Sequence, residues 1–284
     1  MSSSIYTHHA YHGWSILLHP EIRPEEVHRL ISPDGRICAD NSLFKQMESS
    51  DSARVFESVL SSIKQETRVY IKHYLNRSVA DFLKHCLRRS RGKRAFDASL
   101  MLRENSFFAP EPLVLMQKKK NFLPSQSILI TKKALGDVQL ARKLLQLSRE
   151  NTKESLRRKR VIIAEFGSVV GRMHAKGIIH GDLRLGNVLI EEKDSEFSFW
   201  FIDNESTRQF SQAPQRLVRR NLVQINKYGK VNNSERMSFL KAYCSKRGMR
   251  INDLKHLLDR VEERTSAWRV KKAGHSSNSC NCGI

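Results

Sequence analysis

Residues 180–190 read HGDLRLGNVLI, and after a polar turn residues 199–205 read FWFIDNE. The first stretch places Asp182 and Asn187 on a loop that runs into an apolar strand, and the second delivers Asp203 at the end of another apolar strand. Phosphoryl transfer needs a group that orients or deprotonates the acceptor hydroxyl, and oxygen ligands for a magnesium ion that neutralises phosphate charge. The two stretches therefore predict a phosphoryl-transfer centre.

This prediction rests on a combination of features, because a single H-x-D motif would be weak evidence. An aspartate in a loop often caps a turn, and that is the alternative interpretation of Asp182. Here the H-x-D-x-x-x-x-N spacing coincides with an apolar strand at 188–190, a turn-rich segment at 191–196 and a second strand that ends in Asp203. This coincidence favours the catalytic interpretation.

The composition is that of a strongly basic globular protein. The 284 residues are 39% hydrophobic, which is enough for one large domain or two lobes, and they carry a formal net charge of +21. The sequence pI is near 10.1. This charge favours anionic partners such as nucleic acid, phosphorylated ligands or an anionic membrane face, and its sign alone does not choose among them.

The cysteines and the N-terminus indicate a cytoplasmic protein. The five cysteines are scattered and form no disulfide framework, so a reducing compartment is expected. Cys280 and Cys282 are interpreted as part of a frayed tail rather than of a metal site. No apolar run reaches the roughly 18 residues that span a bilayer. The N-terminus also lacks the basic start and apolar middle of a signal peptide, so a soluble or peripheral protein is expected.

The first half of the chain predicts a leader and a small β-rich lobe. Residues 1–41 form the leader, with one strand that pairs onto the lobe and a histidine cluster interpreted as surface residues rather than a metal site (His8, His9 and His12). The lobe spans residues 42–133. Its expected strands cover 53–60, 67–74 and 127–131, and a helix is expected at 95–104 after a basic run at 88–94. That run is either a solvated face or a direct contact with an acidic substrate or membrane.

Alternation along the 67–74 strand singles out one lysine. Val69 and Ile71 fall on one face of the strand and Lys72 on the other. A lysine on a strand beneath a nucleotide can pair with the α- and β-phosphates. Lys72 is therefore the candidate phosphate ligand, and its alternative is an ordinary solvated edge lysine.

The second half predicts a larger helical lobe at residues 134–272, entered through a hinge at 132–137. Helical patterns cover 138–147 and 155–175, and Gly177 caps the second of these helices. Further helices are expected at 234–246 and 252–263, and residues 273–284 are expected to be a disordered tail.

These motifs resemble the protein-kinase-like superfold, and within it the small-molecule branch. His180-Gly181-Asp182 is similar to the H-G-D of aminoglycoside and sugar kinases, where protein kinases usually have H-R-D. Asp203-Asn204-Glu205 is similar to the D-x-D or D-x-E of that branch and lacks the Phe and Gly of D-F-G. The resemblance implies an α+β, two-lobed protein-kinase-like fold, with a small β-rich N-lobe, a larger mainly helical C-lobe and a cleft between them.

More narrowly, the chain resembles the bacterial lipopolysaccharide kinase family, which phosphorylates inner-core heptose or keto-deoxyoctulosonate on the lipid A precursor. The resemblance runs from about 43 to 269 and also rests on the segments 69–74, 91–94, 110–113, 220–226 and 236–243. It implies ATP and Mg²⁺ as cofactors and a lipid-linked glycan as substrate. An anionic membrane surface is the expected further partner, and nucleic acid is disfavoured.

The family pattern implies one role for each matching residue. These are a catalytic base or hydroxyl-orienting group (Asp182), a cation toward the transferring phosphoryl group (Arg184), magnesium ligands (Asn187, Asp203 and, as a supplement, Glu205), a phosphate ligand (Lys72) and its acidic partner (Asp97, with Glu104 as the alternative). The sequence departs from the pattern before Lys72, where no glycine-rich loop precedes the strand and the corresponding turn is ESSDS at 48–52.

We therefore expect an ATP-dependent kinase that phosphorylates a sugar hydroxyl of the lipopolysaccharide inner core, on the inner face of the cytoplasmic membrane. Two alternatives stay open from the sequence. One is an atypical kinase for protein or another small molecule. The other is a nucleic-acid-binding or membrane-binding pseudokinase whose basic surface is its function.

Overall fold

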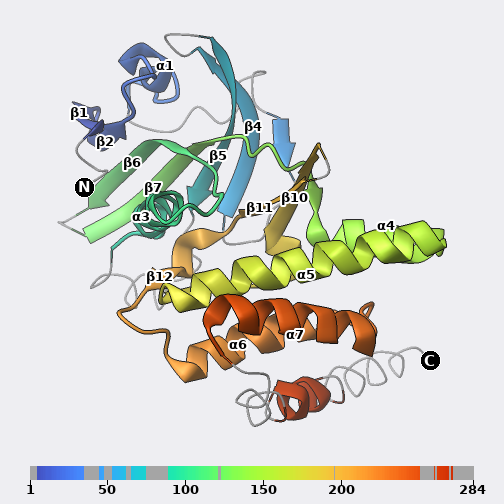
Figure 1. Cartoon of the computed structure of the whole chain (residues 1–284). Coiled ribbons are helices and arrows are strands. Elements are labelled where there is room, and N and C mark those ends of the chain that lie inside the picture. Colours follow the sequence, from blue (N-terminus) through green and yellow to red (C-terminus); the bar gives the residue numbers. More distant parts are fainter. Residues whose placement is uncertain are drawn as a thin grey trace, which may run out of the picture. The chain divides into compact units, whose positions relative to one another are not determined.

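The computed structural model describes residues 5–34, 45–47, 53–61, 65–74, 89–120, 123–194, 196–249, 259, 261–268 and 270 (Figure 1). The chain divides into two compact units. The first comprises Met1–Leu135 and Trp200–Ser206, and the second comprises Gly136–Phe199 and Thr207–Ile284. The predicted tail, Cys280, Cys282 and the 48–52 turn lie outside the described residues, as does most of the helix expected at 252–263.

The first unit is built on a seven-stranded sheet with the order β1-β2-β6-β7-β5-β4-β3. All neighbouring strands in it pair antiparallel. The strands are β1 (Thr7–Tyr11), β2 (Trp14–Leu18), β3 (Lys45–Met47), β4 (Ala53–Ser61), β5 (Glu66–Tyr74), β6 (Pro112–Lys120) and β7 (Leu123–Lys132). The strands predicted at 53–60, 67–74 and 127–131 are confirmed.

The N-terminal segment contributes two strands where one was predicted. β1 and β2 form a hairpin in which Tyr11 pairs with Trp14, and β2 then pairs with β6. His12 and Gly13 connect the strands, and both have positive φ, as a two-residue hairpin turn of type I′ requires. Among the described residues, no group of three or more His, Cys, Asp and Glu side chains is arranged to hold a metal ion.

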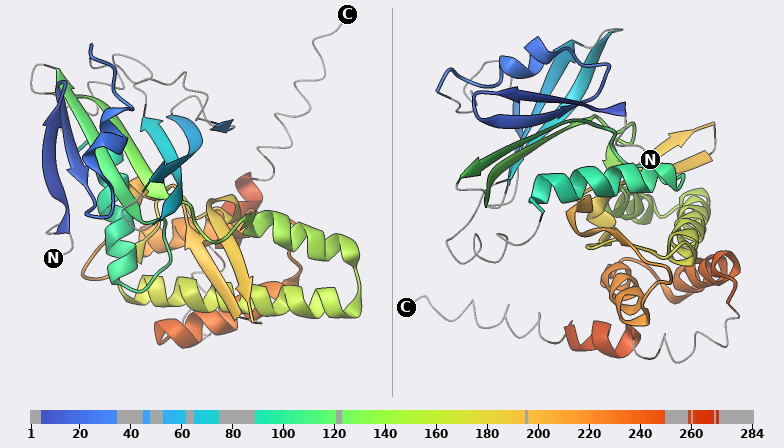
Figure 2. Two further views of the ribbon diagram at one scale, coloured as in Figure 1. Left: turned by 90° about the horizontal axis from the view of Figure 1, so that it is seen from above. Right: turned by 90° about the vertical axis from the view of Figure 1, so that its left-hand side faces the viewer.

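Each face of the sheet has its own core. On one face Val69 and Ile71 of β5 pack with residues of β2, β6 and the segment around helix α1 (Pro24–His28). On the other face Tyr74 packs with Phe96 of helix α3 (Arg91–Glu104). Figure 2 shows α1 and α3 on opposite sides of the sheet. The alternation predicted for β5 is thereby confirmed, and it leaves Lys72 on the same face as α3.

The second unit is mainly helical. Its helices are α4 (Leu140–Glu150), α5 (Lys153–Ala175), α6 (Gln215–Asn226) and α7 (Asn233–Arg247). Short strands accompany them in a three-stranded β11-β10-β8 sheet and a β12-β9 pair, and the last two residues of β11, Trp200 and Phe201, are counted with the first unit. The bounds of these elements are β8 (Val138–Gln139), β9 (Ile178–Ile179), β10 (Val188–Lys193), β11 (Glu196–Phe201) and β12 (Arg208–Gln209). α4, α5 and α7 match predicted helices, whereas α6 was not predicted.

Two glycines let α5 and α7 approach closely, and the helices run side by side (Figures 1 and 2). A Cβ on Gly167 would lie 2.4 Å from the Phe239 carbonyl oxygen, and a Cβ on Gly171 would lie 2.5 Å from that of Tyr243. Such distances are far below van der Waals contact, so only glycine fits at these crossings. The pair fixes α7 against the helix that leads into the H-G-D loop.

Within the described residues, no helix is both long enough and apolar enough to cross a membrane.

Candidate functional site

The H-G-D loop is held in place by the end of α5. Gly177 has φ +73° and follows the last residues of the helix, as predicted for a C-terminal cap. A Cβ at Gly177 would lie 1.9 Å from the carbonyl oxygen of Phe210, so the position excludes other residues. The chain then forms β9, which pairs with β12, and enters the loop at the fully buried His180. The first residue of the loop, His180, is therefore held in a defined position.

Local backbone bonds shape the loop between β9 and β10. The backbone N–H of Asp182 donates to Nδ1 of His180 at 3.1 Å. The N–H of Arg184 donates to the carbonyl of Asp182 at 2.9 Å, and the N–H of Asn187 donates to that of Arg184 at 2.8 Å. A short 3-10 turn, η2 (Leu185–Asn187), then leads into β10. Asp182 and Asn187 thus lie on one loop that runs into a strand, as predicted, and the path of this loop brings the two side chains together.

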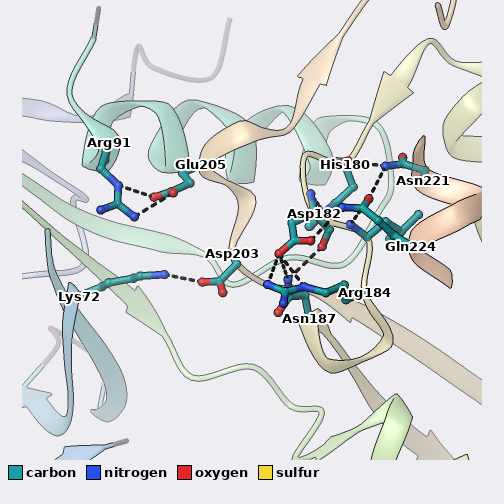
Figure 3. Close-up of polar contacts among 11 residues, drawn as sticks. Lys72, Arg91, His180, Asp182, Arg184, Asn187, Asp203, Glu205, Asn221 and Gln224 are labelled. Carbon is teal, nitrogen blue, oxygen red and sulfur yellow. Dashed lines mark hydrogen bonds and ion pairs between the residues drawn. The ribbon is translucent and has the colours of Figure 1, made fainter. Parts of the chain in front are cut away.

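The Asp182 carboxylate accepts hydrogen bonds from three side chains (Figure 3). Oδ1 accepts from Nε2 of Gln224 at 2.9 Å. Oδ2 accepts from Nδ2 of Asn187 at 3.0 Å and from Nε of Arg184 at 2.9 Å. These donors replace the backbone N–H that a turn-capping aspartate would bind, so the geometry disfavours the capping interpretation.

Arg184 is the most solvent-exposed of the three donors. The Arg184 and Asp182 side chains are 66% and 32% exposed. Ion pairs between such exposed groups contribute roughly 0–1 kcal/mol, so the guanidinium can leave the carboxylate at little cost. Asn187, by contrast, also donates to the Asp182 carbonyl at 2.9 Å, so its amide nitrogen binds both the backbone and the side chain of Asp182.

In the first unit, Lys72 and Asp203 form an ion pair (Figure 3). Asp203 follows β11 and has φ +58°, the left-handed region that residues other than glycine adopt uncommonly. Backbone strain of this kind is concentrated at functional sites. The structure therefore brings together a cation suited to phosphate and an anion suited to a metal, both predicted from the sequence.

Glu205 is bound by an arginine. The Arg91 guanidinium, at the start of α3, donates to both carboxylate oxygens of Glu205 at 3.0 and 2.9 Å (Figure 3). Arg91 also lies over the Tyr74 ring, 5.2 Å from its centroid, and Lys72 lies 5.4 Å from the same ring. Burial raises the pKa of the Tyr74 phenol, and the nearby Glu205 and Asp203 carboxylates raise it further. Tyr74 is therefore a neutral platform for both cations.

Asp97, which was predicted as the acidic partner of Lys72, pairs with other residues in the structure. Its carboxylate pairs with Lys93, one helical turn earlier, at 2.6 Å and with Arg89 at 3.1 Å. The acidic partner that the structure gives Lys72 is Asp203. Local pairing along α3 thus accounts for Asp97, because residues four apart on a helix face each other.

α6 supplies two polar residues that sequence reasoning missed. Gln224 contacts Asp182, and the fully buried Asn221 donates to the His180 carbonyl at 2.7 Å (Figure 3). Asn221 also bonds His174 of α5 at 3.2 Å. Burial lowers the pKa of His174 to about 4, so its imidazole is neutral. The apolar spacing of Val218, Leu222 and Ile225 was the available signal for this helix.

The predicted magnesium ligands have suitable chemistry. Mg²⁺ takes oxygen donors, often one or two carboxylates completed by water and substrate phosphates. Asp203 offers a carboxylate, and Asn187 commits its amide nitrogen to Asp182, which turns its Oδ1 away from that group. Glu205 fits less well, because both of its oxygens already bind Arg91.

Comparisons with known proteins bear on the fold and the family of the chain. A search of curated protein sequences returns no match. Among solved structures, the chain is similar to one described as WaaP in complex with acyl carrier protein, with a TM-score of 0.59 and 15% sequence identity. The similarity covers 78% of this chain and 88% of that one. The likeness confirms the predicted protein-kinase-like fold.

The profile of the lipopolysaccharide kinase (Kdo/WaaP) family matches residues 45–243. This range includes the Lys72 strand, the H-G-D loop, Asp203 and α6. The chain therefore belongs to the lipopolysaccharide kinase (Kdo/WaaP) family, and it is a kinase.

Proposed function

We propose that this kinase transfers the γ-phosphoryl group of ATP to a hydroxyl of an inner-core sugar, heptose or keto-deoxyoctulosonate, on the lipid A–core precursor. The observation that carries the proposal is the Asp182 carboxylate, which two amide side chains hold in one orientation and which remains 32% exposed. A carboxylate fixed in this way is suited to orient an acceptor hydroxyl and to take its proton. Family membership supports a lipopolysaccharide acceptor.

Each remaining residue has a role in the proposed reaction. Lys72 exchanges its contact with Asp203 for the nucleotide phosphates, and Asp203 and Asn187 would hold Mg²⁺. When bound, Mg²⁺ neutralises charge on the transferring phosphoryl group. Arg184 leaves Asp182 and places its charge against the equatorial phosphoryl oxygens. The acceptor oxygen bonds to phosphorus, the bond to ADP breaks, and the hydroxyl proton passes to Asp182.

Arg91 and Glu205 have a supporting role in this scheme. Their bidentate pair ties the residues just after Asp203 to the start of α3. Planar guanidinium–carboxylate pairs add directional specificity as well as energy. We therefore assign Glu205 to the positioning of Asp203 and not to the metal itself.

The basic surface suits the proposed location. A formal charge of +21 is attracted to the anionic inner leaflet and to a phosphorylated glycolipid. The proposal therefore includes a peripheral association with the cytoplasmic face of the inner membrane. Binding to vesicles that contain anionic lipid should weaken steeply as salt is raised, whereas neutral vesicles should bind little.

A panel of acceptors tests the substrate. The 284-residue chain is incubated with Mg²⁺ and ATP labelled in the γ-phosphate, together with lipid A–core, its deacylated form, a generic protein acceptor or no acceptor. We expect label on the two glycan acceptors and none on protein, with the position of the new phosphate read by ³¹P NMR. Label on protein alone would favour an atypical protein kinase, and ATP binding with no transfer to any acceptor would favour the pseudokinase alternative.

A further inference from the structure

A continuous chain of hydrogen bonds runs from α7 through α5 and α6 to the Asp182 carboxylate. It joins Nη1 of Arg247 to Oη of Tyr243, Tyr243 Oη to Nδ1 of His174 at 2.9 Å, and Nε2 of His174 to Oδ1 of Asn221 at 3.2 Å. Asn221 Nδ2 then lies 3.2 Å from Oε1 of Gln224, whose Nε2 reaches Asp182 at 2.9 Å. Three of these bonds, Tyr243–His174, His174–Asn221 and Gln224–Asp182, join residues that are widely separated in the sequence.

The chemistry of the groups fixes the direction of every bond. A backbone carbonyl only accepts, so the amide nitrogen of Asn221 must face His180 and its oxygen must face His174. An amide oxygen only accepts, so Nε2 of His174 carries the proton. In a neutral imidazole Nδ1 is then an acceptor, and it receives the Tyr243 O–H. Arg247 only donates, so Tyr243 accepts from it.

The same reasoning orients Gln224. The backbone N–H of Leu183 donates to Gln224 at 3.0 Å, so the oxygen of the Gln224 amide must face Leu183. Its NH₂ group must therefore face Asp182. Every donor in the chain then points the same way, from the guanidinium of Arg247 toward the carboxylate of Asp182.

Burial strengthens the hydrogen bonds of this chain. Tyr243 and Asn221 are fully buried and His174 is 2% exposed. Hydrogen bonds in such a medium are stronger than in water, and bonds aligned in one direction polarise one another. A chain that starts at a cation and ends at an anion has its dipoles aligned with both charges. It therefore favours one rotamer of Gln224 and one orientation of the carboxylate.

We propose that Gln224 is a positioning residue for Asp182, and that it acts as the last donor of a one-way hydrogen-bond chain that begins at Arg247. The inference rests on the proposed function, since it assigns Gln224 to the carboxylate that receives the acceptor hydroxyl. Arg184 is exposed and must leave Asp182 in the reaction, whereas Gln224 is anchored by Leu183 and Asn221. Gln224 therefore keeps the carboxylate oriented while the arginine moves.

Two substitutions separate positioning from simple packing. Gln224→Met keeps the length and volume of the side chain and removes the donor. Gln224→Glu keeps the oxygen that Leu183 and Asn221 need but places an anion against Asp182. We expect kcat for phosphate transfer to fall about 10- to 100-fold in Gln224→Met and further in Gln224→Glu, with the KM for ATP unchanged. Gln146→Met on α4, whose exposed side chain bonds Glu150, is the matched control and should leave kcat unchanged.

A readout that needs no activity tests the chain itself. ¹⁵N NMR of the imidazole should show His174 as the neutral tautomer with the proton on Nε2, and this assignment should persist in Gln146→Met. A proton on Nδ1 would reverse the direction of the chain and overturn the proposal. So would an active wild-type enzyme whose Gln224→Met variant keeps its kcat. A wild-type protein that transfers no phosphate would contradict the proposed function, with the tautomer still deciding the direction of the chain.

Discussion

The buried ion pair between Lys159 of α5 and Glu235 of α7 allows a quantitative prediction of the stability lost when the pair is broken. The two side chains are 5% and 2% exposed. Lys159 Nζ lies 2.9 Å from Oε2 of Glu235 and 2.7 Å from the carbonyl oxygen of Lys230. The same Glu235 oxygen also accepts the backbone N–H of Asn232 at 2.8 Å. Lys159→Met keeps most of the aliphatic packing and leaves the carboxylate buried without its cation.

Loss of one partner of a buried pair costs about 3–5 kcal/mol. The bond from Asn232 remains and offsets part of this cost, so we expect a loss of about 3 kcal/mol in the stability of the second unit. Arg158 is the matched control, because it precedes Lys159 on α5 and pairs with Glu192 at the surface, where the side chains are 45% and 27% exposed. Arg158→Met should cost no more than about 1 kcal/mol.

Hydrogen exchange of the α5 and α7 amides, measured by mass spectrometry, reports the opening of this unit directly. A loss of about 3 kcal/mol should speed exchange on the order of 100-fold at these amides. The double variant Lys159→Met/Glu235→Gln keeps the bond to Asn232 and removes the buried charge, so it should recover most of the loss. Equal exchange in Lys159→Met and Arg158→Met would refute the reasoning, because the pair would then behave as a hydrated one.

Three further predictions concern the contacts around the site. Arg91→Lys replaces a bidentate donor by a point charge, so exchange at residues 203–206 should rise about tenfold, and an unchanged rate would contradict the assigned role of the Arg91–Glu205 pair. Gly171→Ala should cost about 1–3 kcal/mol through overpacking against α7, whereas Gly229→Ala, with no atom within 4 Å of the added Cβ, should leave the melting temperature unchanged or higher. The pKa of His174 is about 4 in the folded protein and about 6.5 in the unfolded chain, so the unfolded state binds more protons between these two values. The contribution of His174 to the free energy of unfolding is therefore fully present above pH 6.5 and falls by about 1.4 kcal/mol per pH unit toward pH 4. An NMR titration of the His174 imidazole with a midpoint near 6.5 would contradict this.

Features that follow from the spacing of nearby residues could be predicted from the sequence. The alternation in β5 placed Lys72, the glycine after α5 marked the start of the H-G-D loop, and the spacing from Asp182 to Asn187 placed both residues on one loop, where the structure shows them in contact. Each of these follows from a backbone period or from a short turn. The positive φ of Asp203 and its pairing with Lys72 were beyond such patterns, because they depend on residues far apart in the sequence.

The missed residues have a shared physical cause. Helix α6 contains Arg216, Arg219 and Arg220, and this charge obscured its apolar stripe in the sequence. Gln224 then reaches Asp182 through tertiary packing, which leaves no spacing signal. Asp97 shows the opposite error: an acid on the helix expected to face Lys72 was predicted as its partner, but a lysine one turn earlier on α3 binds it instead.

The most direct test of the account is the initial rate of γ-phosphate transfer from ATP to the lipid A–core acceptor, measured for the wild-type enzyme, Asp182→Asn and the surface control Glu150→Gln. Asparagine keeps the size of the side chain and removes its charge and its capacity to take a proton. We predict a fall in kcat of about 10²- to 10⁴-fold for Asp182→Asn and none for Glu150→Gln. An Asp182→Asn enzyme that transfers phosphate at the wild-type rate would contradict the central claim that this carboxylate acts on the acceptor hydroxyl.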